Sequence, residues 1–159
     1  MMRIGHGYDA HRFLKDRPCI LCGVVVPSDV GPDGHSDADV PVHALMDAFL
    51  GALALGDIGK MFPDSDETYR GADSMKLLKT VYMRVKALGY QLSNADMTII
   101  CQSPRLAPYI DAMRENVAVA LDVPVDTVSV KATTEEKMGF TGEGLGMAAH
   151  AVVLLEKRG

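Results

Sequence analysis

The spacing of apolar residues divides the chain into amphipathic helices and short apolar strands. Helical spacing is clearest in SMKLLKTVYMRVKALG, residues 74–89, where Leu78, Val81 and Val85 recur on one face and Gly89 ends the pattern. β-Branched runs such as TVSVKAT, residues 127–133, are typical of strands. The whole pattern predicts strands at residues 2–9, 19–26, 95–101, 127–133 and 147–157, and helices at residues 40–55, 74–88 and 108–121.

Two acidic segments rich in glycine and proline interrupt this pattern. Residues 28–39, SDVGPDGHSDAD, and residues 56–73, GDIGKMFPDSDETYRGAD, have the composition of surface loops. Asp39 and Asp73 close these loops at the positions where a side chain caps the following helix. Pro41 then falls in the first helical turn, where its missing N–H costs nothing.

The order of predicted elements indicates the fold class. Two strands, two helices, a strand, a helix and two strands require both hairpin and crossover connections. We therefore expect an α+β fold, with one mixed sheet and helices packed on one face. With 159 residues, the chain is expected to form a single domain over residues 1–159. The uncovered sheet face would need a partner, so we expect an oligomer.

Composition narrows the classes of function. The net charge is −5, which gives no basic surface for nucleic acid. No apolar run approaches the ~20 residues that cross a membrane. The beginning, MMRIGHGYD, lacks the layout of a secretory signal, so we expect a cytoplasmic protein. A phosphate ester would be repelled by such an acidic chain unless cations inverted the local field.

The three cysteines favour no metal or redox site. Cys19 and Cys22 form a C-x-x-C pair within PCILCGVVVP. This run is predicted to be a strand, in which positions three apart face opposite sides. We interpret both as ordinary strand cysteines, and the odd count with Cys101 argues against structural disulfides.

The segment GHGYDAHRF contains the strongest candidate for metal chemistry. Asp9 and His11 are two positions apart, so in an extended chain both side chains point to one face. His43, near the start of the first helix, is the best third ligand, and the set leaves a fourth position open as in catalytic zinc sites. The alternative is an ordinary half-buried histidine. Asp47, one turn after His43, is a candidate to orient its imidazole, with an ordinary solvated helix carboxylate as the alternative.

Other polar residues lie in loops. His35 and Ser36 precede the first helix, and Asp57, Asp64 and Asp66 lie in the second acidic loop. A histidine and hydroxyl suit an anionic group, while the acids suit a ligand hydroxyl or a cation; solvated turns are the alternative.

The segment TTEEKMGFTGEGLG follows the strand 127–133 and is predicted to be a loop with one helical turn. Thr133, Thr134 and Glu136 offer hydroxyls for phosphate and a carboxylate for a hard cation such as Mg²⁺. A simple helix cap is the alternative interpretation.

Taken together, several stretches resemble one family from end to end. They are RIGHGYDAHRF, GHSDADVPVHALMDAFLGALALGDIGKMFPDSD, GADS, TIICQSPRLAPYI and VSVKATTEEKMGFTGEG. This set is similar to the 2-C-methyl-D-erythritol 2,4-cyclodiphosphate synthases, the cyclases of the non-mevalonate isoprenoid pathway. The resemblance implies a homotrimer whose sheets face the centre and whose active sites lie between adjacent subunits.

The resemblance also implies two metals per site, a zinc and a second divalent cation, Mg²⁺ or Mn²⁺. The zinc ligands of the family fall on Asp9, His11 and His43, and the carboxylate for the second ion falls on Glu136.

The remaining site positions of the family divide into three groups. His35 and Thr134 match the positions that stabilise the reacting phosphates. The erythritol-phosphate side corresponds to Ser36, Asp57, Ile58, Gly59, Phe62, Pro63, Asp64, Ser65, Asp66 and Phe140. The cytidine pocket corresponds to Cys101, Gln102, Ser103, Pro104, Arg105, Leu106 and Ala107 of the neighbouring chain, with Ala132 and Thr133.

The sequence departs from the family pattern at four positions. Arg105 stands where a lysine is common, and Cys101 and Ser103 replace other small residues. Glu143 stands where some members carry an arginine associated with isoprenoid diphosphates in the central cavity, so we do not expect that ligand here.

The implied reaction turns a cytidine diphosphate substrate into a cyclic diphosphate and CMP, without a general base. Two other functions use the same residues: a zinc-dependent phosphohydrolase or phosphodiesterase, and a trimeric binding module with structural zinc. Release of CMP would distinguish either enzyme from the binding module. The phosphorus-containing product, cyclic or linear, would distinguish the synthase from the phosphohydrolase.

Overall fold

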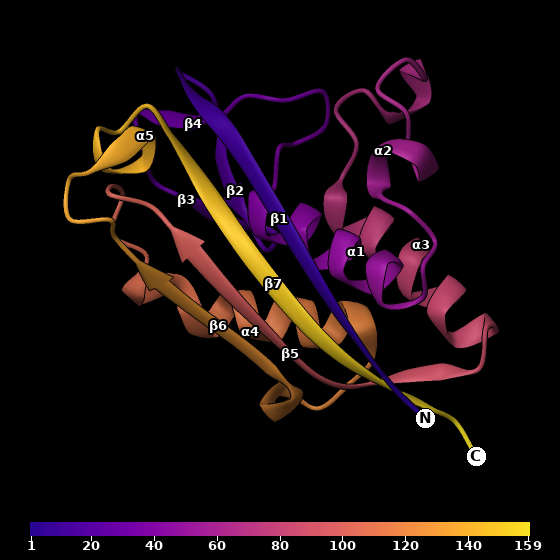
Figure 1. Cartoon of the computed structure of the whole chain (residues 1–159). Coiled ribbons are helices and arrows are strands. Elements are labelled where there is room, and N and C mark those ends of the chain that lie inside the picture. Colours follow the sequence, from indigo (N-terminus) through magenta and orange to yellow (C-terminus); the bar gives the residue numbers. More distant parts are fainter.

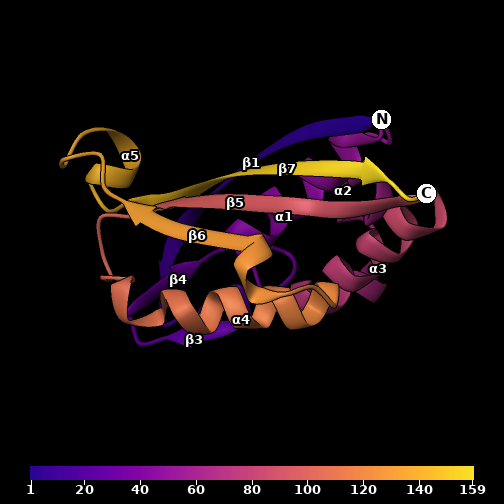
Figure 2. The ribbon, with the colours of Figure 1, turned by 90° about the horizontal axis from the view of Figure 1, so that it is seen from below.

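A mixed five-stranded sheet forms one layer of the molecule, and the helices form the other. In this computed structural model, which describes residues 1–159, the strand order is β4-β1-β7-β5-β6. Seen from the side, the helices α1 (Val40–Ala52), α3 (Ser74–Ala87) and α4 (Ile110–Leu121) all lie beneath the sheet and leave its upper face open (Figure 2). The strands are β1 (Met2–Lys15), β4 (Val30–Pro32), β5 (Tyr90–Ile100), β6 (Val128–Thr133) and β7 (Gly146–Lys157), with β2 (Cys19–Leu21) and β3 (Val24–Val26) in a separate hairpin.

Strand β7 organises the sheet, because it pairs antiparallel with both β1 and β5 (Figure 1). The β5–β6 pair is parallel, and the crossover between these strands carries α4. The sheet is therefore mixed and covered on one face, which confirms the α+β prediction. None of the helices is long and apolar enough to cross a membrane.

Helices α1 and α3 begin where the sequence predicts. Asp39 caps α1 by accepting from the Val42 N–H, and Asp73 caps α3 by accepting from the Met75 N–H. Gly89 has a φ of +82°, which ends α3 because side chains disfavour this conformation. The helices are α1 (Val40–Ala52), α2 (Ile58–Met61), α3 (Ser74–Ala87), α4 (Ile110–Leu121) and α5 (Gly139–Gly142).

Several predicted boundaries are wrong. The strand predicted at residues 2–9 continues to Lys15 as β1, because its pairing with β7 and β4 extends through residues 10–15. The strand predicted at residues 95–101 begins at Tyr90 as β5, because its pairing with β7 starts there. Residues 19–26 are not one strand, because Cys22 and Gly23 adopt positive φ values of 48° and 71° and turn the chain into the β2–β3 hairpin. The two acidic loops also contain regular structure, namely β4 and α2. The Cys19 and Cys22 thiols are free and buried, but Cys22 lies in a turn rather than on a strand.

Strand β1 packs unusually close to α1 through glycine. A β-carbon on Gly5 would lie 1.9 Å from the Ala48 carbonyl oxygen, and one on Gly7 would lie 1.8 Å from that of Ala44. Only glycine allows the two backbones to approach this closely. The contact places the middle of β1 against the start of α1, where the polar residues of interest are found.

The open sheet face carries apolar and aromatic side chains. Ile4 and Tyr8 on β1 are 72% and 47% exposed, and Val152 on β7 is 38% exposed. Strand pairing sets Tyr8 opposite His150, and their rings are 4.9 Å apart. The helix-facing side of the sheet contributes instead to one buried core of 34 residues.

Candidate active site

Strand β1 directs Asp9 and His11 toward α1. Asp9 pairs with Ala149 and His11 with Met147 of β7, so residues 9–11 are extended as the metal hypothesis requires. Gly5 and Gly7 share this face by the two-residue alternation of a strand. The side chains of Asp9 and His11 therefore emerge beside α1, just past the glycine contact.

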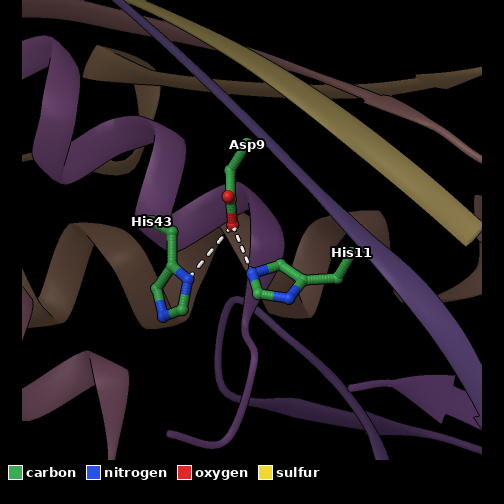
Figure 3. A group of neighbouring side chains, drawn as sticks. All are labelled: Asp9, His11 and His43. Atoms are coloured by element: carbon green, nitrogen blue, oxygen red, sulfur yellow. Dashed lines mark hydrogen bonds and ion pairs between the residues drawn. The ribbon is translucent and has the colours of Figure 1, made fainter. Parts of the chain in front are cut away.

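His43, on the first turns of α1, completes a cluster with these two residues (Figure 3). Its Nδ1 lies 3.1 Å from Asp9 Oδ2, and the His11 Nε2 lies 3.0 Å from the same oxygen. One potential ligand atom from each residue lies within 4.8 Å of the other two. His43 itself is only 8% exposed.

This geometry fits a divalent metal. Zinc bonds of about 2.0–2.1 Å in a tetrahedron hold neighbouring ligand atoms about 3.3 Å apart. The observed separations from Asp9 Oδ2, 3.0 and 3.1 Å, lie close to that edge length. One carboxylate and two imidazoles are also the donor types that zinc prefers. The cluster can thus bind a metal with small side-chain adjustments.

Asp9 and His11 each favour the charged form of the other. Burial acts to raise the pKa of Asp9, but hydrogen bonds from His11 and His43 outweigh it and lower this pKa below 3.8. The same contact with Asp9 raises the pKa of His11 above 6.5. The carboxylate is therefore held in the ionised form that a cation requires.

In each imidazole, the outer nitrogen, which is the ring nitrogen that points away from Asp9, faces a protein group. His11 Nδ1 bonds to the Asp33 carbonyl oxygen, and His43 Nε2 lies 2.9 Å from Ser74 Oγ and 3.1 Å from Ser36 Oγ. The expectation that Asp47 orients His43 is wrong. Asp47 instead accepts from the Ile58 N–H at 2.8 Å and anchors α2 to α1.

A cavity of about 270 Å³ opens beside the cluster. Of the predicted site residues, it brings together Asp9, His11, His35, Ser36, His43, Ile58, Gly59, Phe62 and Asp64. The His35 Nε2 atom is buried and has no hydrogen-bond partner. A buried polar atom of this kind is costly unless a ligand satisfies it, so this face of the cavity suits an acceptor such as a phosphate oxygen.

The guanidinium of Arg17 holds the loop that carries His35 and Ser36. It donates to the carbonyl oxygens of Pro32 at 2.5 Å, Gly34 at 2.9 Å and Ser36 at 2.8 Å. No sequence motif points to this role of Arg17, because the carbonyls that it binds come together only when the loop is folded.

A second cavity, of about 240 Å³, gathers predicted nucleotide residues. It is lined by Cys101, Gln102, Pro104, Arg105, Leu106, Ala107, Ala132, Thr133 and Thr134. No residue lines both this cavity and the one beside the metal cluster. Figures 1 and 2 place α5 and α2 toward opposite ends of the molecule.

Other predicted residues lie outside both cavities. Glu136 is exposed, with its N–H bonded to Thr134 Oγ1, and is not part of the metal cluster of this chain. Phe140 is 43% exposed on α5. Asp57 caps α2, and Asp66 caps the turn at residues 67–69. Neither cavity includes Pro63, Ser65 or Ser103.

Comparison with known proteins identifies the family. Residues 2–156 match the YgbB family. The chain belongs to this family. A curated relative from Trichlorobacter lovleyi, named 2-C-methyl-D-erythritol 2,4-cyclodiphosphate synthase, is 61% identical over 154 residues, which are 97% of this chain and 98% of the relative. The family expected from the motifs is thereby confirmed.

Solved structures of similar sequence share the fold. The bifunctional IspDF of Campylobacter jejuni superposes with a TM-score of 0.95 at 43% identity, over 99% of this chain and 42% of that longer one. A 2C-methyl-D-erythritol-2,4-cyclodiphosphate synthase in a CDP-bound form gives a TM-score of 0.89 at 38% identity, over 97% of this chain and 100% of that one.

Proposed function

We propose that this protein converts 4-diphosphocytidyl-2-C-methyl-D-erythritol 2-phosphate to 2-C-methyl-D-erythritol 2,4-cyclodiphosphate and CMP. The observation that carries the proposal is the convergence of Asp9, His11 and His43 beside a cavity, in a chain of the YgbB family. The protein would act as a cyclising, CMP-releasing lyase of cytoplasmic isoprenoid precursor synthesis.

The reaction needs no general base. The second pKa of a phosphate monoester is about 6, so the attacking 2-phosphate is already mostly ionised at neutral pH. This phosphate forms a bond to the β-phosphorus while the bond to CMP breaks and CMP leaves with the electron pair. The main obstacles to the reaction are then the repulsion between the anionic phosphate groups and the geometry of ring closure.

The residues of the chain address both obstacles. Asp9, His11 and His43 would hold Zn²⁺, and Glu136 would hold Mg²⁺ or Mn²⁺. These cations supply neutralisation of the phosphate charge when bound. His35, with its unpartnered buried Nε2, and Thr134 would donate to phosphate oxygens. Holding the reacting groups in line can lower the barrier by about 7–11 kcal/mol.

Two sets of side chains would clamp the ends of the substrate. The erythritol-phosphate end would contact Ser36, Asp57, Ile58, Gly59, Phe62, Pro63, Asp64, Ser65, Asp66 and Phe140. The cytidine end would contact Cys101, Gln102, Ser103, Pro104, Arg105, Leu106, Ala107, Ala132 and Thr133. The CDP-bound form of the synthase that shares this fold supports a cytidine ligand for the second set.

A homotrimer would join the two cavities, which share no residue within one chain. One subunit would provide the metal cluster and its neighbour the nucleotide cavity. The exposed Ile4, Tyr8 and Val152 support this arrangement, because an apolar sheet face would be covered at the centre of a trimer.

The test combines metal content with product analysis. The His43→Ala protein should lose zinc and nearly all turnover, whereas Glu136→Ala should retain zinc but need more Mg²⁺ or Mn²⁺. Full activity of metal-stripped His43→Ala protein would contradict the assignment.

Phosphorus NMR of the wild-type product separates the three functions. A cyclic diphosphate supports the synthase, and a linear product indicates a phosphohydrolase. Failure to release any CMP indicates a binding module.

A further inference from the structure

The orientation of His43 depends on groups that lie behind it, away from the cavity. Its Nδ1 faces Asp9, so the metal would bind at that nitrogen. An imidazole can offer a lone pair at Nδ1 only if any proton of the neutral ring is on Nε2. Whatever accepts a hydrogen bond from Nε2 therefore decides whether His43 is ready to bind metal.

Ser74 is the best-placed acceptor. Its Oγ lies 2.9 Å from His43 Nε2, and the residue is fully buried at the first position of α3. The Ser74 hydroxyl also lies 2.5 Å from Asp37 Oδ1, and the Ser74 N–H donates to Asp37 Oδ2 at 3.0 Å. The Asp37 side chain thus accepts hydrogen bonds from both the hydroxyl and the N–H of Ser74.

Only one assignment of hydrogen-bond donors and acceptors is consistent with these contacts. An ionised carboxylate accepts hydrogen bonds and cannot donate, so the single hydroxyl proton of Ser74 points to Asp37. The Ser74 oxygen is then left as an acceptor toward His43, so Nε2 carries a proton, and Nδ1 is the nitrogen that would exchange its contact with Asp9 for the metal. Ser36 does not impose a direction in this way, because its hydroxyl contacts His43 and the Ala38 N–H but no carboxylate.

We propose that Asp37 and Ser74 are positioning residues that fix His43 with its Nδ1 lone pair toward the metal. The inference rests on the metal site of the proposed function and extends it to two residues outside the metal cluster. Partners of this kind typically change metal affinity by about 10–100-fold.

The decisive variant is Asp37→Asn, which keeps the shape but replaces one carboxylate oxygen by an NH₂ group. Asp37 Oδ2 accepts from the Ser74 N–H at 3.0 Å, and Oδ1 accepts from the Asp39 N–H at 3.2 Å as well as from the Ser74 hydroxyl, so either orientation of the amide sets its NH₂ group against one backbone N–H. The variant therefore weakens the acceptor that directs the Ser74 proton away from His43, and the Ser74 oxygen is no longer held as the acceptor of the Nε2 proton. A second variant, Ser74→Ala, removes the acceptor and leaves the backbone contact with Asp37. Thr80→Ala removes an exposed hydroxyl from the same helix and serves as the control.

The measurement is zinc affinity, by competition with a chromophoric chelator, for the full-length wild-type protein and all three variants. Asp37→Asn and Ser74→Ala should bind zinc about 10–100-fold more weakly, and Thr80→Ala should match the wild type. Thermal unfolding in chelator reports whether each variant is folded, so a folding failure of Ser74→Ala leaves Asp37→Asn to decide.

A second readout excludes a purely structural role. In zinc-loaded wild-type protein, nitrogen NMR should show His43 with a slowly exchanging Nε2–H. Wild-type zinc affinity in both folded variants, or a His43 ring without that proton, would overturn the positioning role alone. Absence of zinc binding by the wild type would instead overturn the proposed metal site, and this inference with it.

Discussion

Gly7 of β1 lies so close to Ala44 of α1 that a β-carbon on Gly7 would be 1.8 Å from the Ala44 carbonyl oxygen. This contact joins the strand that carries Asp9 and His11 to the helix that carries His43. The separation of the three polar side chains is therefore set by a glycine two residues before the first of them.

Substitution Gly7→Ala should damage stability and metal binding together. The new methyl group cannot avoid the backbone of α1, so the helix must move away from β1. We expect a loss of about 3 kcal/mol in the free energy of unfolding and weaker zinc binding by the folded fraction. Urea unfolding and chelator competition measure the two effects.

The matched control is Gly51→Ala on α1. A β-carbon there would meet only the His6 carbonyl oxygen, at 3.8 Å. Alanine in a helix is favoured over glycine by about 0.5–1 kcal/mol, so this variant should be neutral or stabilised. Equal effects of the two substitutions would contradict the close-contact explanation.

Removal of the Arg17 side chain should weaken substrate binding while zinc remains. Arg17→Ala leaves three loop carbonyls without their donor, so the loop carrying His35 and Ser36 loses its fixed shape. We expect kcat/KM to fall at least about 10-fold, which corresponds to about 1.4 kcal/mol. Arg17→Lys should not restore it, because an ammonium cannot reproduce the planar fork. Lys15→Ala, which removes an exposed charge nearby, should keep wild-type kcat/KM.

The three thiols should react slowly in the folded protein. Burial raises the pKa of Cys101 to about 11 and that of Cys19 to about 12, and it also raises the pKa of Cys22 well above 9.0. The thiolate is the reactive form, so modification near pH 8 should be at least about 100-fold slower than in urea. A thiol reagent with a coloured product gives both rates, and one rapidly reacting thiol in the native protein would disprove the expectation.

The free energy of unfolding of the metal-free protein should depend on pH through the carboxyl group of Asp39. Burial raises the pKa of this fully enclosed carboxyl from 3.8 to about 7, although the Gly23 and Cys22 N–H groups oppose the shift. A raised pKa means that the folded state binds the proton more tightly than the unfolded state. Its contribution to stability is complete below about pH 4 and lost as the pH rises through 7.

The experiment compares urea unfolding of wild-type and Asp39→Asn protein between about pH 4 and pH 8. The difference in unfolding free energy should change by an amount of order 4 kcal/mol over this range. A constant difference would show that Asp39 is ionised throughout, held by its backbone donors.

Local patterns predicted most of the elements correctly. Capping by Asp39 and Asp73, and termination by Gly89, are interactions between residues close in sequence, so they can be recognised without a fold. The Cys22–Gly23 turn escaped prediction because an apolar, β-branched run usually continues as a strand, and only the φ values reveal the hairpin.

The sequence by itself determined that Asp9 and His11 share one face, because strand alternation fixes the direction of side chains two positions apart. It also indicated His43 as a third candidate and the YgbB family as a whole. Only the tertiary structure decided that Ser74 rather than Asp47 faces the outer nitrogen of His43. The physical reason is distance along the chain: Ser74 follows His43 by 31 residues and reaches it only because α3 packs against α1.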